Sequence, residues 1–178
     1  SDLFASRAPA KLNDKVTHLE RIDGVDRWVC GARDFGSMGG NVIGKDHNKL
    51  LGRLAFQTLD EGHPGSYQAL PRLRAMDEMG IHAQICYHNG GVTQAGSLIA
   101  LDDDELAFTI LKIYNDAAAE RQEESGQRLF TLAHLPLWDK AAAGSGSAML
   151  HRHADQGLRA ARHARALPDS VIHKPVLG

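Results

Sequence analysis

Two consecutive stretches decide the fold: LPRLRAMDEMGIHAQICYHNGG at residues 70–91 and DDDELAFTILKIYNDAAAERQEESGQRLFTLAHLPLWD at residues 102–139. Each opens with apolar residues at helical spacing and continues into a short apolar run that is typical of a strand. The second run, residues 129–137, is apolar almost throughout, as expected for a parallel strand that is covered on both faces. This alternation predicts an α/β fold in which the strands at residues 82–87 and 129–137 are parallel and adjacent.

The ends of both helices are marked by particular residues. Pro71 is favoured as a first helical residue, and Gly80 is typical of the position just after a helix. Asp102, with Glu105 three residues later, has the spacing of a capping box that opens the second helix. Gly126 is expected to end this helix. Its apolar stripe consists of Leu106, Ile110, Ile113, Tyr114 and Ala117.

The preceding part of the chain, residues 1–68, is mixed in composition and rich in loop residues. Residues 27–30 and 33–35 flank the pair Gly31-Ala32. Two short strands joined by a tight turn are therefore expected there.

Residues 140–178 lack the pattern of the two deciding stretches, and their composition changes abruptly to alanine, arginine and histidine. Before residue 167 their large apolar side chains are Met149, Leu150 and Leu158. Burying so few cannot offset a backbone entropy cost of about 1–2 kcal/mol per residue. We expect a poorly patterned tail with at most one loosely docked helix near residues 148–156. Limited proteolysis is then expected to cut the tail before it cuts residues 70–139.

Composition limits the classes of function. The chain has 178 residues, 43% of them hydrophobic, and a net charge of −2 with no basic block, so neither nucleic acid nor an anionic membrane is an expected partner. No apolar run approaches the length of about 20 residues that a membrane span needs. Cys30 and Cys86 are far apart and show no metal or redox spacing, which is typical of reduced cysteines in a cytoplasmic protein.

Three blocks of sequence resemble amidohydrolase-related enzymes, the group that includes the amino-carboxymuconate-semialdehyde decarboxylases. The first is RLRAMDEMGI at residues 72–81, leading into Gln84. The others are DELA leading to YND, within residues 104–116, and RLF leading to LPLWD, within residues 128–139. The hairpin around Trp28 is similar to an insertion that follows the first strand in this family.

The resemblance implies a (β/α)₈ TIM barrel, which needs about 250 residues. We therefore expect a partial barrel with about three strand-helix units. Residues 1–139 would be the N-terminal part of the barrel, with residues 1–68 as the insertion and residues 70–139 as the helix-strand units. Residues 140–178 would be the tail.

In the family a divalent metal, which we expect to be zinc, is held at the C-terminal ends of the strands. Its ligands are a His-x-His at the first strand, histidines near the fifth and sixth strands, and an aspartate near the eighth. None of these can be assigned to a position in this chain, so no metal-binding or catalytic residue is predicted. The His-x-His sequence His151-Arg152-His153 lies in the tail. Residues two apart on a helix point to different sides, so we expect surface histidines there rather than metal ligands.

The implied activity is hydrolysis of a C–N or C–O bond of a small-molecule substrate, or nonoxidative decarboxylation. We expect this chain alone to be inactive and not to bind zinc stoichiometrically. The alternatives are a noncatalytic truncated or frame-disrupted relative, or a binding fragment that depends on a partner. A homo-oligomer is left open.

Three residues are candidates to face a substrate. His88 and Asn89 follow the first strand of the pair, and Trp138 follows the second, at the edge where barrel enzymes bind substrates. The simpler alternative for His88 and Asn89 is polar residues of an ordinary loop. His134, inside the predicted second strand, is expected to be a hydrogen-bonded core histidine. Asp139 is expected to be the N-cap of a following helix.

Overall fold

The computed structural model describes residues 3–37, 43–46, 56–88, 95–136 and 138–139. The expectations for Asn89, for the His151-Arg152-His153 segment and for the whole tail lie outside these residues.

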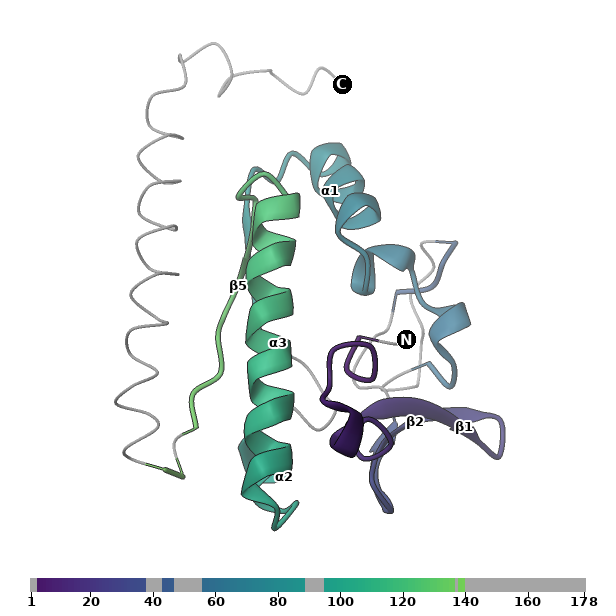
Figure 1. The fold of residues 1–178 in the computed structure, drawn as a ribbon. Coiled ribbons are helices and arrows are strands. Elements are labelled where there is room, and N and C mark those ends of the chain that lie inside the picture. The colour runs from purple at the N-terminus through teal and green to yellow at the C-terminus, as the bar shows by residue number, and fades with distance from the viewer. Residues whose placement is uncertain (1–2, 38–42, 47–55, 89–94, 137, 140–178) are drawn as a thin grey trace.

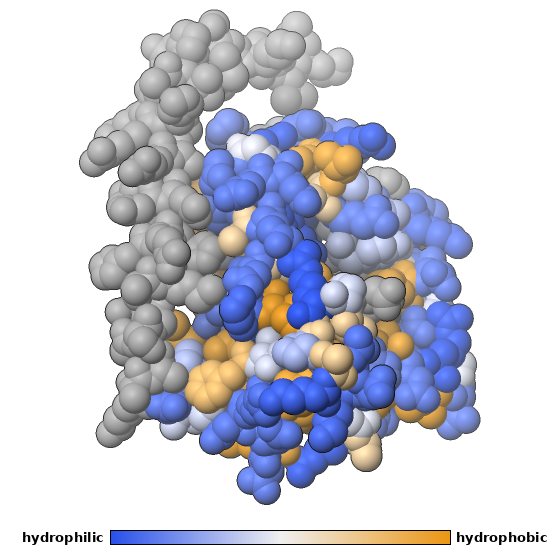
Figure 2. Space-filling view, in the orientation of Figure 1, coloured by the Kyte–Doolittle hydropathy of each residue, from blue (hydrophilic) through white to orange (hydrophobic). Residues whose placement is uncertain are grey.

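Helices and strands both occur in the described part, as predicted. Its elements are β1 (His18–Ile22), β2 (Val25–Cys30), β3 (Arg33–Ser37), α1 (Ala69–Glu78), β4 (Gln84–Cys86), α2 (Ala95–Ile99), α3 (Asp104–Glu124) and β5 (Leu129–Thr131), with 3-10 turns at Ala10–Leu12, Leu59–Glu61 and Pro64–Ser66. Helix α3 runs through the molecule, with the β5 segment along one side of it (Figure 1). Figure 2, in the same orientation, shows hydrophilic side chains over most of this face, with small apolar areas between them.

Strands β4 and β5 are parallel neighbours, which confirms the central prediction. Their residues pair from Gln84 with Leu129 to Cys86 with Thr131. Strand β5 is shorter than predicted: among the described residues, its pairing with β4 is continued by the single bond from Leu132 N to Cys86 O (3.1 Å). Helix α3 packs against β5, in which Leu129 is buried and Phe130 and Thr131 are half-buried, whereas Ile85 of β4 is 62% exposed.

One side chain joins the start of β5 to the chain that leads into β4. The guanidinium group of Arg128 donates to the carbonyl oxygens of Ile81 (2.9 Å) and His82 (2.8 Å). It also forms an ion pair with Asp77 at the end of α1 (2.7 Å). Arg128 thus connects α1, β4 and β5.

Helix α3 starts one residue later than predicted. Its N-cap is Asp103, whose carboxylate accepts from Leu106 N (3.0 Å), and Asp102 adopts a positive φ of 54°. A side-chain oxygen at the N-cap satisfies one of the backbone N–H groups that the first turn leaves free. The prediction for the other end is confirmed: Gly126 has φ 62°, and Gln127 N donates back into the last turn.

Helix α1 starts at Ala69, two residues before the predicted Pro71. Proline is tolerated at the third position because the first four N–H groups of a helix have no intrahelical partner. The predicted end is confirmed. Gly80 has φ 69° and its N–H donates to Asp77 O (3.1 Å), while Ile81 N donates to Met76 O (2.8 Å). These bonds form a Schellman motif.

The predicted hairpin is present as β2 and β3, with Cys30 paired to Arg33. A third strand, β1, was not predicted, and it pairs antiparallel with β2. The turn between β1 and β2 consists of Asp23 (φ 51°) and Gly24 (φ 81°). Two positive φ values in a two-residue loop match the type I′ turn that joins twisted strands.

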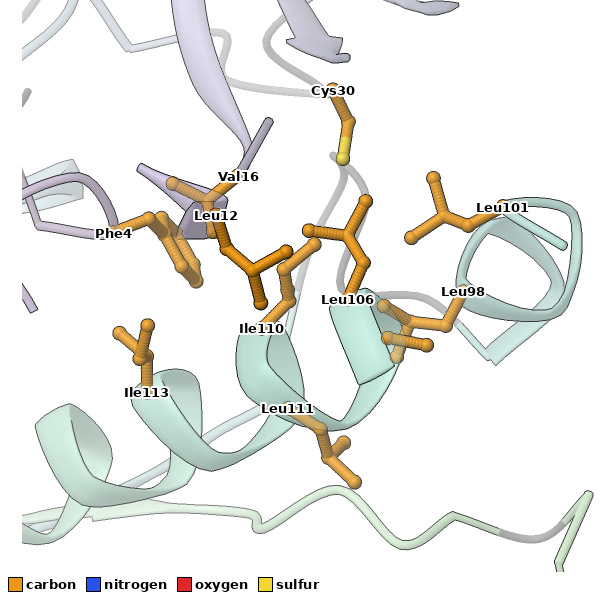
Figure 3. Close-up of a cluster of buried hydrophobic side chains, with 11 residues drawn as sticks. Phe4, Leu12, Val16, Cys30, Leu98, Leu101, Leu106, Ile110, Leu111 and Ile113 are labelled. Atoms are coloured by element: carbon orange, nitrogen blue, oxygen red, sulfur yellow. The ribbon is translucent and has the colours of Figure 1, made fainter. Parts of the chain in front are cut away.

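The main core lies between α3 and the N-terminal part of the chain. Figure 3 shows Phe4 and Leu12 facing Ile110 of α3, with Leu98 and Leu106 beside them. Four of the five residues of the predicted stripe are buried, and Tyr114 is half-buried. The N-terminal segment therefore covers the side of α3 that this stripe forms.

Candidate functional site

Two histidines meet where β4 and β5 end. His88 lies two residues beyond β4, and His134 lies three residues beyond β5. Their ring centroids are 3.5 Å apart and the rings are tilted by 47°. The parallel pairing of the two strands places both carboxyl ends at the same edge, and this brings the histidines together.

Helix α3 holds the backbone of His134 in place. The side chain of Asn115 donates from Nδ2 to His134 O (2.9 Å), and its Oδ1 accepts from His134 N (2.9 Å). Asn115 is 4% exposed and His134 is 7% exposed. A side-chain amide offers one donor and one acceptor side by side, so it replaces the hydrogen bonds that a neighbouring strand would give.

The surroundings of His134 keep its ring neutral. Burial, and then the neighbouring His88, lower the pKa of His134 from 6.5 to about 4. The ring of Tyr114 lies edge-on to it with centroids 5.1 Å apart, and burial raises the pKa of the Tyr114 hydroxyl. His134 is therefore an uncharged imidazole at neutral pH.

Both imidazoles keep a polar atom without a partner. His88 Nδ1 and His134 Nε2 are buried and have no hydrogen-bond partner in the described part of the chain. Leaving a buried donor or acceptor unpaired costs about 1–3 kcal/mol. Such unpaired groups are uncommon in folded proteins, and here two of them lie in side chains that touch.

The predicted site residues differ in where their side chains lie. His88 is at the expected strand end and half-buried, whereas Trp138 packs its ring against Phe108 of α3, with centroids 5.9 Å apart. His134 is buried as predicted, but the hydrogen bonds to Asn115 are made by its backbone. The helix expected after Asp139 lies outside the described residues.

Sequence reasoning missed the contact between the two histidines and the role of Asn115. The signal for the contact was that each histidine follows an apolar run in a pair of strands predicted to be parallel. The signal for Asn115 was a polar residue on the side of α3 that carries Leu111 and Ala118, both of which are buried.

A metal centre does not fit the described residues. A catalytic zinc normally has three protein ligands, and nowhere in the described ranges do three His, Cys, Asp or Glu side chains come together. The acidic residues at the start of α3 serve as the N-cap and first turn, where they also favour the helix dipole. The two cysteines are free, Cys30 buried and Cys86 half-buried.

None of the helices in the described ranges combines the length and the apolar character needed to cross a membrane. In comparisons with known proteins, no family model matches the chain and no curated protein is similar to it.

Proposed function

We propose that this chain supplies strand-end residues to the small-molecule site of a metal-dependent hydrolase of C–N or C–O bonds, or of a related nonoxidative decarboxylase. The observation that supports the proposal is the contact of His88 with His134 at the carboxyl ends of two parallel strands. In parallel β/α proteins this edge is where substrates bind.

His134 would act on the substrate through hydrogen bonds rather than charge. A neutral imidazole has one N–H donor and one bare nitrogen acceptor. The free positions, His88 Nδ1 and His134 Nε2, would orient a substrate oxygen or polarise a carbonyl group. When bound, zinc would supply Lewis-acid activation of water or of the substrate, and its ligands are not found among the described residues.

A second candidate is a noncatalytic relative that binds a partner or a ligand without turnover. Two observations favour it. The described residues offer no three-ligand metal site, and the face of β4 away from α3 exposes Ile85 (62%), followed by Tyr87 (74%). An uncovered apolar sheet face is typical of a surface that another element or chain covers.

Binding and turnover distinguish the candidates. Nitrogen-15 spectra of the histidine rings would be recorded while benzoate, benzamide or 2,3-dihydroxybenzoate is added at millimolar concentration. The proposed site predicts shifts for His88 and His134, loss of binding in His134→Gln, and no effect of His82→Gln, which replaces an exposed histidine just before β4.

The same three proteins would then be loaded with zinc and assayed for ester hydrolysis, anilide hydrolysis and decarboxylation. Turnover that requires zinc and falls at least tenfold in His134→Gln would support the enzyme. Binding without turnover would favour the noncatalytic relative. If neither binding nor turnover is observed, the small-molecule site is refuted in both its enzymatic and its noncatalytic form.

A further inference from the structure

His134 is contacted from three directions, by two rings and by one side-chain amide. The ring of His88 contacts it from the β4 side, and the ring of Tyr114 contacts it edge-on from α3. The Asn115 amide binds its backbone on both sides. The Cys86 thiol lies near this cluster and contributes electrostatically to the raised pKa of Tyr114.

This arrangement does not tolerate a proton on His134. His134 as a residue is 7% exposed, so a charged imidazole would lose most of its hydration, which is costly without an ionic partner. No carboxylate in the described part of the chain contributes to the pKa of His134, and the one nearby titrating group that does is His88, which opposes the charge. A protonated His134 would be hydrated if it left this cluster, but it is not hydrated while it is packed there.

We propose that the His88–His134 contact is a proton-operated latch, closed at neutral pH, whose protonation releases residues 132–136 from α3. Three bonds of that segment would break on release: His134 N to Asn115 Oδ1 (2.9 Å), Asn115 Nδ2 to His134 O (2.9 Å) and Leu132 N to Cys86 O (3.1 Å). The latch goes beyond the proposed function, because it requires only the histidine pair and its hydrogen bonds.

The sign of the effect follows from the two states of His134. Its pKa is about 4 in the closed state and near 6.5 in a solvated one. Because the closed state binds the proton more weakly, the open fraction rises as the pH falls through 6.5 towards 4. These two pKa values of His134 predict that the open fraction increases about 20-fold when the pH falls from 7 to 5.

Hydrogen exchange of backbone amides tests the latch in the 178-residue chain. Protection of the His134 and Leu132 amides, corrected for the intrinsic rate at each pH, is expected to fall by at least tenfold from pH 7 to pH 5. Ile110, a buried residue of α3, is the reference, and its protection is expected to change less than twofold. His82→Gln, the matched histidine control, is expected to behave as the natural chain does.

His134→Gln removes the titrating ring, so protection at Leu132 is expected to be the same at both pH values. If far-UV circular dichroism shows that this variant does not fold, His88→Gln replaces it, and the pKa of His134 measured by NMR is expected to rise. A fall of protection that Ile110 shares, or that persists in His134→Gln, overturns the latch. So does an ordinary pKa near 6.5 for His134 in the natural chain.

Discussion

The amide of Asn115 gives the sharpest test of how α3 holds the strand-end site. Replacing Asn115 by alanine removes both bonds to His134, each 2.9 Å long. The N–H and C=O groups of His134 would then be buried without a partner, and each unpaired group costs about 1–3 kcal/mol. We expect Asn115→Ala to lower the free energy of unfolding by about 2–6 kcal/mol.

The assay is urea unfolding followed by far-UV circular dichroism. The slope of the free energy of unfolding against urea concentration is compared between the variant and the natural chain, to confirm that the folded state stays compact. Asn13→Ala is the matched control, because Asn13 is exposed and donates a single bond to Ala5 O (3.0 Å). Its expected cost is below about 1 kcal/mol. Equal costs for the two variants, or a cost below about 1 kcal/mol for Asn115→Ala, would refute the reasoning.

Four further outcomes are expected. Asp103→Ala should cost about 1 kcal/mol in urea unfolding because the N-cap bond is lost, while Asp103→Asn should keep most of it. Gly126→Ala should cost about 1–2 kcal/mol because alanine is strained at φ 62°, although no atom lies within 4 Å of the added Cβ; a neutral result would show that the helix end relaxes. With a thiol reagent at pH 8, Cys86 should react well before Cys30, whose pKa burial raises to about 11, and equal rates would contradict the burial of Cys30. Stability should fall by at most about 3 kcal/mol as the pH drops from 6.5 towards 4, since the unfolded state binds the proton of His134 more tightly, and His134→Gln should flatten this loss.

Elements with strong local signals could be predicted from the sequence. The C-terminal ends of α1 and α3 follow from Gly80 and Gly126, since glycine adopts a positive φ without strain. The parallel pairing of β4 with β5 follows from the helix between them, which gives the long crossover that parallel strands need. These features depend on neighbours in the chain or on chain length.

Features set by distant packing could not be predicted in the same way. The apolar run at residues 129–137 predicted a nine-residue strand, but β5 pairs with β4 over three residues, and farther along the chain the Asn115 side chain binds the backbone of His134. The contact between His88 and His134 requires two segments 46 residues apart to end at the same level of one sheet. Strand β1 was missed although Asp23-Gly24 is a known hairpin turn, because its five residues lack a clear apolar alternation.

The bonds of Arg128 also decide how the short parallel pair is aligned. Three residue pairs alone specify an alignment weakly, and sliding β5 by one residue would turn Leu129, now 1% exposed, outward and Phe130 inward. The same slide would carry the Arg128 guanidinium away from the carbonyls of Ile81 and His82. A misaligned chain would thus lose a buried leucine and these charge-assisted bonds together, so Arg128 favours the observed alignment over the shifted one.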